Sequence, residues 1–263
     1  MTQVRQGYAP VGALRMYYEV HGGARPGRVP LVLIHGGGST IGTNLGALIP
    51  LLTGTRQVIA VEEQGHGHTA SIDRPYTLEN SADDIAAVLE HLEIPSADVL
   101  GFSAGGGVAM RLATRHPGRV RRLILASSFF RRDGMADGFW DSMEGATIEA
   151  MPEVYKDADR RINPDPRHQQ QLFEQDSQRT RSFEDWPDSD LEAIASPTLV
   201  LVADRDVVTV EHGVRMARTI PGARLMVVPG THGDYLGEIA SSAGDTTLAR
   251  ATAPFLTRFL DEG

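Results

Sequence analysis

Apolar, β-branched runs recur along the chain, and each is followed by loop residues and then by a helical pattern. Six runs are almost continuously apolar: Leu31–Ile34, Gln57–Val61, Val99–Phe102, Leu123–Ala126, Thr198–Val202 and Leu225–Val228. Such runs are typical of parallel strands that are buried on both faces of a sheet. Two earlier segments, Tyr8–Val11 and Leu14–Val20, alternate more between apolar and polar residues, which predicts antiparallel strands at an edge.

Segments with helical periodicity separate these strands. They are Leu78–Leu92, Ala104–His116, Glu211–Ile220 and Thr246–Leu260. Pro254 is expected either to bend the last helix or to mark its start. The alternation of strand and helix predicts a doubly wound α/β fold, in which helices flank a mostly parallel eight-stranded sheet.

One long stretch interrupts this alternation. Residues 129–195 contain no convincing buried strand, yet they hold both tryptophans, Trp140 and Trp186, and many of the Phe and Met residues. We expect a helical cap that lies over the sheet, and an α/β core formed by residues 1–128 and 196–263. The same residues also suit a helical subdomain that packs mainly on itself.

Composition narrows the possible partners. The formal net charge is −9 and no Lys/Arg cluster dominates a tail or a face, so nucleic acid and anionic membranes are not expected to bind. The chain has no cysteine, which excludes disulfides, thiolate metal sites and a Cys nucleophile. No signal peptide or membrane span is recognisable, so a cytoplasmic location is expected. The sequence does not indicate an oligomeric state.

The segment Gly101-Phe102-Ser103-Ala104-Gly105 joins a predicted strand directly to a predicted helix. A Gly-x-Ser-x-Gly sequence in this context is typical of a nucleophile elbow, a tight turn that exposes the serine hydroxyl. The two glycines leave room for the turn, and the helix N-terminus favours developing negative charge. The alternatives are a phosphate-binding loop or a packing turn.

A glycine-rich loop, His35-Gly36-Gly37-Gly38-Ser39, follows the predicted strand Leu31–Ile34. An acyl-transfer reaction creates an oxyanion, which needs preorganised N–H donors. We expect one donor from Ala104, the residue after the nucleophile, and the other from Gly37, with Gly38 as the alternative. No Lys-Ser/Thr pair follows the glycines, so a P-loop is excluded.

The expected acid and base lie after two later strands. Asp204 and Asp206 both follow Thr198–Val202, and Asp206 is the preferred partner for a histidine. His232 follows Leu225–Val228 in a glycine-flanked loop. A histidine can take the proton of a serine hydroxyl and return it to a leaving group, while a carboxylate holds the ring in the required tautomer. We therefore predict Ser103, Asp206 and His232 as a catalytic triad.

The sequence predicts neither a cofactor nor a metal site. There is no Gly-x-Gly-x-x-Gly after the first strand of the kind that binds dinucleotides. His66 and His68 form a His-x-His pair, but no third ligand type lies nearby in the sequence, so a structural role is expected for both.

Together these motifs resemble those of the α/β-hydrolase superfamily, in particular its small serine-esterase-like members with a helical cap after the sixth strand. The resemblance covers nearly the whole chain. Val61–Thr69 is similar to the family's turn after the fourth strand, although Glu62 stands where Asp is usual. Ala203 replaces the usual glycine of the acid turn. Since a few relatives carry the acid after strand six, Asp133 is a minor alternative.

The resemblance implies a class of reaction. Relatives that use Asp at the elbow carry out other chemistry, whereas Ser103 implies acyl transfer and hence hydrolysis of a carboxylic ester or related acyl bond. A cap rich in Phe, Met and Trp favours a small, partly hydrophobic substrate. The alternatives are a C–C bond hydrolase or a lactonase on the same triad, or a ligand-sensing protein with weak turnover.

Overall fold

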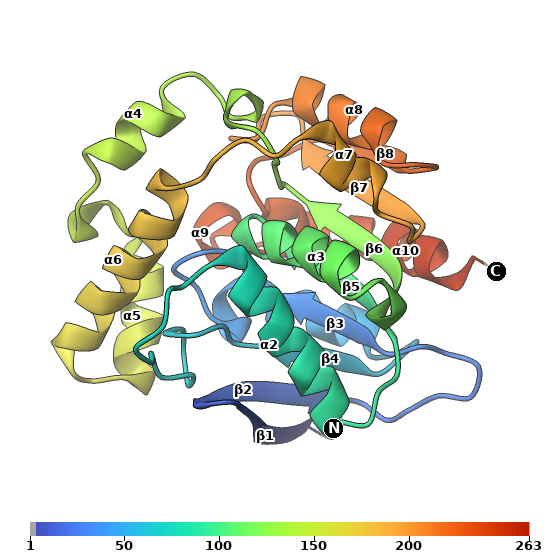
Figure 1. The fold of residues 1–263 in the computed structure, drawn as a ribbon, viewed down its shortest axis with the longest axis horizontal. Helices are drawn as coiled ribbons and strands as arrows, with labels where there is room; N and C mark the ends of the chain where they lie inside the picture. Colours follow the sequence, from blue (N-terminus) through green and yellow to red (C-terminus); the bar gives the residue numbers. More distant parts are fainter. Residues whose placement is uncertain (1–3, 263) are drawn as a thin grey trace.

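The computed structural model describes residues 4–262, and its centre is an eight-stranded sheet (Figure 1). The strand order is β1-β2-β4-β3-β5-β6-β7-β8. The strands are β1 Val4–Val11, β2 Leu14–His21, β3 Leu31–Ile34, β4 Val58–Val61, β5 Ala97–Phe102, β6 Val120–Ala126, β7 Thr198–Ala203 and β8 Arg224–Val228. Strand β2 pairs antiparallel with both β1 and β4, and the remaining pairs are parallel. The predicted fold class is confirmed.

The central strands are buried on both faces because helices cover both sides of the sheet. On one face, α2 (Leu78–His91), α3 (Ala104–Arg115) and α8 (Val210–Thr219) pack on the strands. On the other, the short α1 (Ile49–Leu52) and the C-terminal α10 (Thr247–Asp261) do so. Helix α10 runs through Pro254, so this proline does not mark its start.

Strand β8 differs from the expectation of burial on both faces. It closes one edge of the sheet, and its side chains Leu225 and Val227 are exposed. The apolar run predicted the strand, but it did not predict that the strand lies at the edge.

Helices fill the stretch between β6 and β7. They are α4 Phe139–Glu144, α5 Glu153–Ile162, α6 Pro166–Arg181 and α7 Asp188–Glu192. In Figure 1, α4, α5 and α6 stand together at one side of the sheet, whereas α7 lies near α8. Trp186, just before α7, is buried in the main core under Arg111. The last part of the segment expected to be a cap therefore packs with the core, and the boundaries 129–195 stay a prediction.

Shorter helical turns complete the described chain. They are the π-helical turn η1 Ile41–Leu45, the 3-10 turns η2 Pro117–Arg119, η3 Arg132–Gly134, η4 Ile148–Ala150 and η5 Asp234–Leu236, and helix α9 Ile239–Ser242. Within residues 4–262, none of the helices has the length and apolar character needed to cross a bilayer.

Candidate active site

Ser103 occupies a strained turn between β5 and α3. Its φ of 54° and ψ of −121° lie in a region that L-residues rarely adopt. The two flanking glycines make this turn possible: a Cβ at Gly101 would overlap the Gly105 carbonyl, and a Cβ at Gly105 would overlap the His35 carbonyl. The Ser103 N–H donates to the Ala126 carbonyl oxygen at 2.9 Å, which ties the turn to the end of β6.

The structure brings Ser103, His232 and Asp206 into one hydrogen-bonded line. Nε2 of His232 lies 3.0 Å from the Ser103 hydroxyl oxygen, and Nδ1 of His232 lies 2.7 Å from Oδ1 of Asp206. The residues follow β5, β8 and β7 at the carboxyl ends of parallel strands. This edge is where folds of this kind bind ligands.

Asp206 is held as an anion. Its side chain has no exposed surface, and it accepts hydrogen bonds from the backbone N–H groups of Val208 and Ala203 at 3.2 and 3.3 Å and from the Ser127 hydroxyl. Burial alone would raise the pKa of Asp206, but the hydrogen bonds from His232 and Ser127 outweigh it and lower the pKa below its usual value. The carboxylate is therefore ready to accept Nδ1–H of His232.

The other two candidate acids lie elsewhere. The carboxylate of Asp204 accepts the Gly230 N–H at 2.8 Å and its side chain is 52% exposed. Asp133 is 67% exposed and lies 3.4 Å from Arg215 on α8. Neither of these carboxylates contacts the imidazole of His232.

Sequence reasoning missed Ser127 and Tyr235. Ser127 follows β6 directly and has a φ of 47°, and its hydroxyl bonds to both Asp206 and the Tyr235 hydroxyl. Tyr235 is completely buried. A signal did exist for Ser127, because it stands at the same carboxyl edge of the sheet as Ser103.

The glycine-rich loop lies beside Ser103. Asn44 holds the loop by accepting the Gly36 N–H at 2.6 Å through Oδ1. The Gly38 N–H donates to the Asp176 carboxylate of α6, so it is already engaged. Gly37 and Ala104 line the same cavity as Ser103. Their role as the two N–H donors for an oxyanion stays a prediction.

The cavity above Ser103 has a volume of about 390 Å³. Its walls come mainly from the helical segment after β6 and carry large apolar side chains: Phe129, Met135, Phe139, Met143, Met151, Phe173 and Phe183. Among the lining residues that the structure describes, the acidic and basic side chains are Asp176, Arg179 and His232. The cavity suits a small, mostly apolar ligand.

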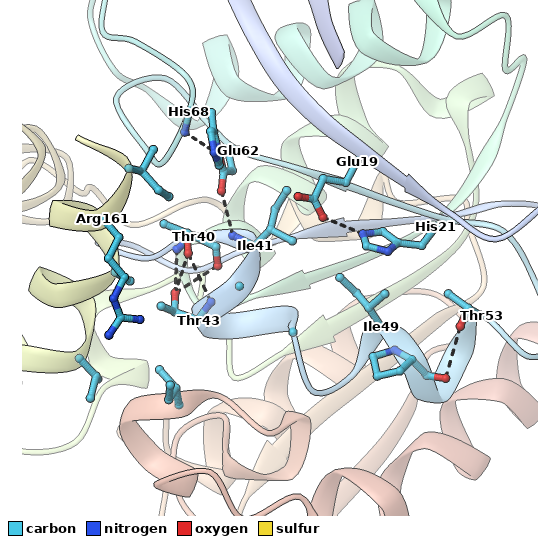
Figure 2. Close-up of a pocket in the computed structure, with 17 residues that line it drawn as sticks. Glu19, His21, Thr40, Ile41, Thr43, Ile49, Thr53, Glu62, His68 and Arg161 are labelled. Atoms are coloured by element: carbon cyan, nitrogen blue, oxygen red, sulfur yellow. Dashed lines mark hydrogen bonds and ion pairs between the residues drawn. The ribbon is translucent and has the colours of Figure 1, made fainter. Parts of the chain in front are cut away.

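A second cavity of about 560 Å³ lies on the far side of η1, between β2, α1 and α5. Figure 2 shows Glu62 there, with His68 on one side and the backbone of Ile41 on the other. The Glu62 carboxylate accepts both the N–H and the ring nitrogen Nδ1 of His68, at 2.7 and 2.8 Å. Ser103, Asp206 and His232 do not line this cavity.

His66 and His68 therefore point to different carboxylates. His68 bonds to Glu62, whereas Nε2 of His66 lies 3.0 Å from Asp176. Over the described part of the chain, no group of three or more His, Cys, Asp or Glu side chains is arranged to hold a metal ion. Glu62, the departure from the family pattern, anchors the turn through its side chain.

Comparisons with known proteins identify the family. The model of the alpha/beta hydrolase fold family matches residues 29–166. The RutD protein of Caulobacter sp. (strain K31), which its name assigns as a carbamate hydrolase, is 30% identical over 83% of this chain and 89% of its own length. The 2-hydroxymuconate semialdehyde hydrolase of Pseudomonas sp. (strain CF600) is 43% identical, but the match spans only 38% of this chain and 36% of that relative.

Solved structures agree on the fold. The 2-hydroxy-6-oxo-6-phenylhexa-2,4-dienoate hydrolase (BphD) of Rhodococcus sp. strain RHA1 superposes with a TM-score of 0.80 over 100% of both chains, at 18% identity. The matched family model and the near-full-length relative lead to one conclusion: this chain belongs to the α/β-hydrolase fold family.

Proposed function

We propose that this protein is a serine hydrolase that cleaves a carboxylic ester, or a related acyl bond, of a small and partly hydrophobic substrate. The observation that carries the proposal is the line of contacts from Ser103 through His232 to Asp206, at 3.0 and 2.7 Å. A serine hydroxyl becomes a useful nucleophile only when a positioned base takes its proton. In support, His232 lies within hydrogen-bond distance of Ser103, and the buried Asp206 carboxylate contacts its other ring nitrogen.

Acylation begins when the Ser103 oxygen attacks the substrate carbonyl carbon and its proton passes to Nε2 of His232. The carbonyl oxygen becomes an oxyanion, which the N–H groups of Gly37 and Ala104 stabilise. The intermediate collapses as the bond to the leaving oxygen breaks and His232 gives that oxygen its proton. Asp206 keeps Nδ1 protonated and stabilises the imidazolium.

Deacylation repeats the sequence with water. His232 removes a proton from the water as its oxygen attacks the acyl carbon bound to Ser103. A second oxyanion forms at Gly37 and Ala104, and the bond to the serine oxygen breaks as His232 returns the proton to it. The products are the free acid and the regenerated enzyme, and every proton moves through one imidazole.

The cavity supports the choice of substrate. About 390 Å³ of mostly apolar space accommodates a short acyl chain together with a modest leaving group. One relative is named as a carbamate hydrolase, and another, matched over 40% of this chain, is named as a pimeloyl-[acyl-carrier protein] methyl ester esterase. Both kinds of substrate have a carbonyl carbon bonded to an oxygen or nitrogen atom that can leave. We therefore assign the bond class as carboxylic ester or a close relative of it.

The experiment is turnover of p-nitrophenyl butyrate with no metal added. Wild type should release p-nitrophenol, and Ser103→Ala should lower kcat by about a thousandfold or more. Ser142→Ala on α4, where the serine is exposed, is the matched control and should behave like wild type. If Ser103→Ala keeps full activity, the mechanism is wrong. If neither wild type nor variant turns over the ester, the general esterase assignment is wrong, and a narrow hydrolase or a ligand sensor is favoured.

A second candidate is hydrolysis of a C–C bond. The observation that favours it is the 43% identity to the 2-hydroxymuconate semialdehyde hydrolase of Pseudomonas sp. (strain CF600) over 102 residues. Loss of the conjugated chromophore of 2-hydroxymuconate semialdehyde, with no release of p-nitrophenol from simple esters, would select this activity over the first.

A further inference from the structure

Four ionisable side chains form a cluster where α6 meets the glycine-rich loop. The Asp176 carboxylate accepts the Gly38 N–H, lies 3.0 Å from Nε2 of His66 and lies 3.2 Å from Nη2 of Arg179. The other end of the guanidinium lies 3.1 Å from Glu63. The cluster thus connects a helix of the inserted segment to the loop beside Ser103.

The two basic side chains of this cluster, Arg179 and His66, already have hydrogen-bond partners within the protein. Arg179 is 7% exposed, is paired at both ends, and stacks its guanidinium 3.9 Å from the centre of the Tyr76 ring. His66 is fully buried, and its second ring nitrogen bonds to the Gln64 carbonyl at 3.1 Å. A substrate carboxylate entering the cavity would therefore have to displace Asp176 to reach either cation.

Asp176 is the most exposed of the four side chains, at 14%, and its carboxylate lies over Gly37 and Gly38. Burial alone would raise the pKa of Asp176, but His66 and Arg179 outweigh it and lower the pKa to about 2. Asp176 is thus an anion at neutral pH, in the cavity that contains the nucleophile.

The cluster cannot present net positive charge to the cavity. Asp176 and Glu63 contribute two negative charges, and Arg179 contributes one positive charge. The total is therefore zero when His66 is protonated and −1 when it is neutral. The histidine among the described lining residues is His232, and its two ring nitrogens contact Ser103 and Asp206.

We infer that Asp176 is a specificity-determining residue that restricts the cavity to substrates without a negative charge, so that neutral esters are accepted and half-esters of dicarboxylic acids are rejected. This inference deepens the proposed function and rests on it. It also counts against the second candidate, because 2-hydroxymuconate semialdehyde carries a carboxylate, as does the dienoate in the printed name of BphD.

The test compares two ligands that differ in one charge. Dimethyl adipate is neutral, and monomethyl adipate is its anionic counterpart with one methyl group fewer. Binding is measured by titration calorimetry at neutral pH in the Ser103→Ala protein, so that neither ligand is consumed. The neutral diester should bind at least about tenfold more tightly than the half-ester, the size expected for one partly screened like-charge contact.

Two variants in the Ser103→Ala background test whether Asp176 causes the preference for the neutral ligand. Asp176→Asn keeps an oxygen acceptor for the Gly38 N–H but removes the charge, and it should reduce the preference to about twofold or less. Glu174→Gln removes one charge from an exposed position of the same helix and should leave the preference unchanged. This control separates the local effect of Asp176 from the net charge of the protein.

The outcomes are distinct. Equal binding of both ligands, tighter binding of the half-ester, binding of neither, or an unchanged preference in Asp176→Asn would each overturn the inference. Hydrolysis of dimethyl adipate by the protein with Ser103 intact is measured separately. A neutral preference without hydrolysis would contradict the proposed function while supporting the role of Asp176 in binding.

Discussion

The carboxylate of Asp206 contacts His232 through Oδ1 and receives the hydroxyl of Ser127 on Oδ2. The two oxygens therefore have different side-chain partners. Ser127 and the backbone N–H groups of Val208 and Ala203 together fix the rotation of the carboxylate against the imidazole. The Tyr235 hydroxyl in turn bonds to Ser127, so the chain of contacts that begins at Ser103 extends into the core.

Ser127→Ala should lower kcat by about tenfold and leave KM nearly unchanged, because a charge-assisted hydrogen bond of about 1.5 kcal/mol to the Asp206 carboxylate is lost. Steady-state kinetics with p-nitrophenyl butyrate measure this. Ser128→Ala changes the neighbouring hydroxyl, which has no hydrogen-bond partner among residues 4–262, and is the comparison. An equal decrease in kcat in both variants would show that the Ser127 hydroxyl has no particular role in catalysis.

The three candidate acids can be separated by conservative variants. Asp206→Asn should lower kcat by about a thousandfold or more, because the amide cannot hold the imidazole in the required tautomer. Asp204→Asn and Asp133→Asn should stay within about twofold of wild type, because neither side chain touches His232. A large loss in Asp133→Asn with an active Asp206→Asn would transfer the role of the acid to the end of strand β6.

The turn around Ser103 requires glycine at positions 101 and 105 because neither position has room for a Cβ atom. Gly105→Ala should lower the free energy of unfolding by about 3 kcal/mol or prevent folding, because the new methyl group would overlap the His35 and Ile34 carbonyls of strand β3 and its following loop. Gly145→Ala follows α4 and places its methyl group in open space, so it should stay within about 0.5 kcal/mol. Urea unfolding followed by circular dichroism measures both variants, and equal stability would show that the space around Gly105 does not require a glycine.

His212 makes stability depend on pH. Burial lowers its pKa from 6.5 to about 4, and Nε2 accepts the Phe130 N–H at 3.2 Å, which requires the neutral ring. Between these two values the unfolded chain binds a proton that the folded protein does not. The contribution of His212 to the free energy of unfolding is therefore fully present above pH 6.5 and is lost as the pH falls towards 4. Its size is at most about 3 kcal/mol.

His212→Gln keeps an acceptor for the Phe130 N–H but does not titrate. The free energy of unfolding of this variant, measured in urea from pH 7 to pH 4, should fall less steeply than that of wild type. Parallel curves for the two proteins would show that His212 is not the source of the dependence.

The fold could be predicted from the sequence because its strands are short apolar runs and its chemistry-bearing loops directly follow them. The carboxyl ends of parallel strands share one edge, so the sequence alone predicts that Ser103, Asp206 and His232 lie together. The site residues that the sequence does not predict are those placed by contacts between distant parts of the chain. Asp176 stands in a polar helix whose sequence does not indicate which face meets the glycine loop, 138 positions earlier.

The edge position of strand β8 and the path of helix α10 through Pro254 could not be predicted for the same reason. The run Leu225–Val228 is as apolar as a central strand, and only the order of the sheet reveals that one of its faces is exposed. Pro254 is a helix breaker by propensity, yet α10 continues through it while packing on the sheet. In both cases tertiary packing overrides the local pattern.

Ser103 is expected to become covalently acylated during turnover. The direct measurement is mass spectrometry of peptides from enzyme quenched with acid during turnover of p-nitrophenyl butyrate. A butyryl group is expected on the peptide that contains Ser103, and no acylated peptide is expected from Ser103→Ala treated in the same way. Steady turnover with the acyl group on another residue, such as Ser127 or Ser128, would contradict this expectation.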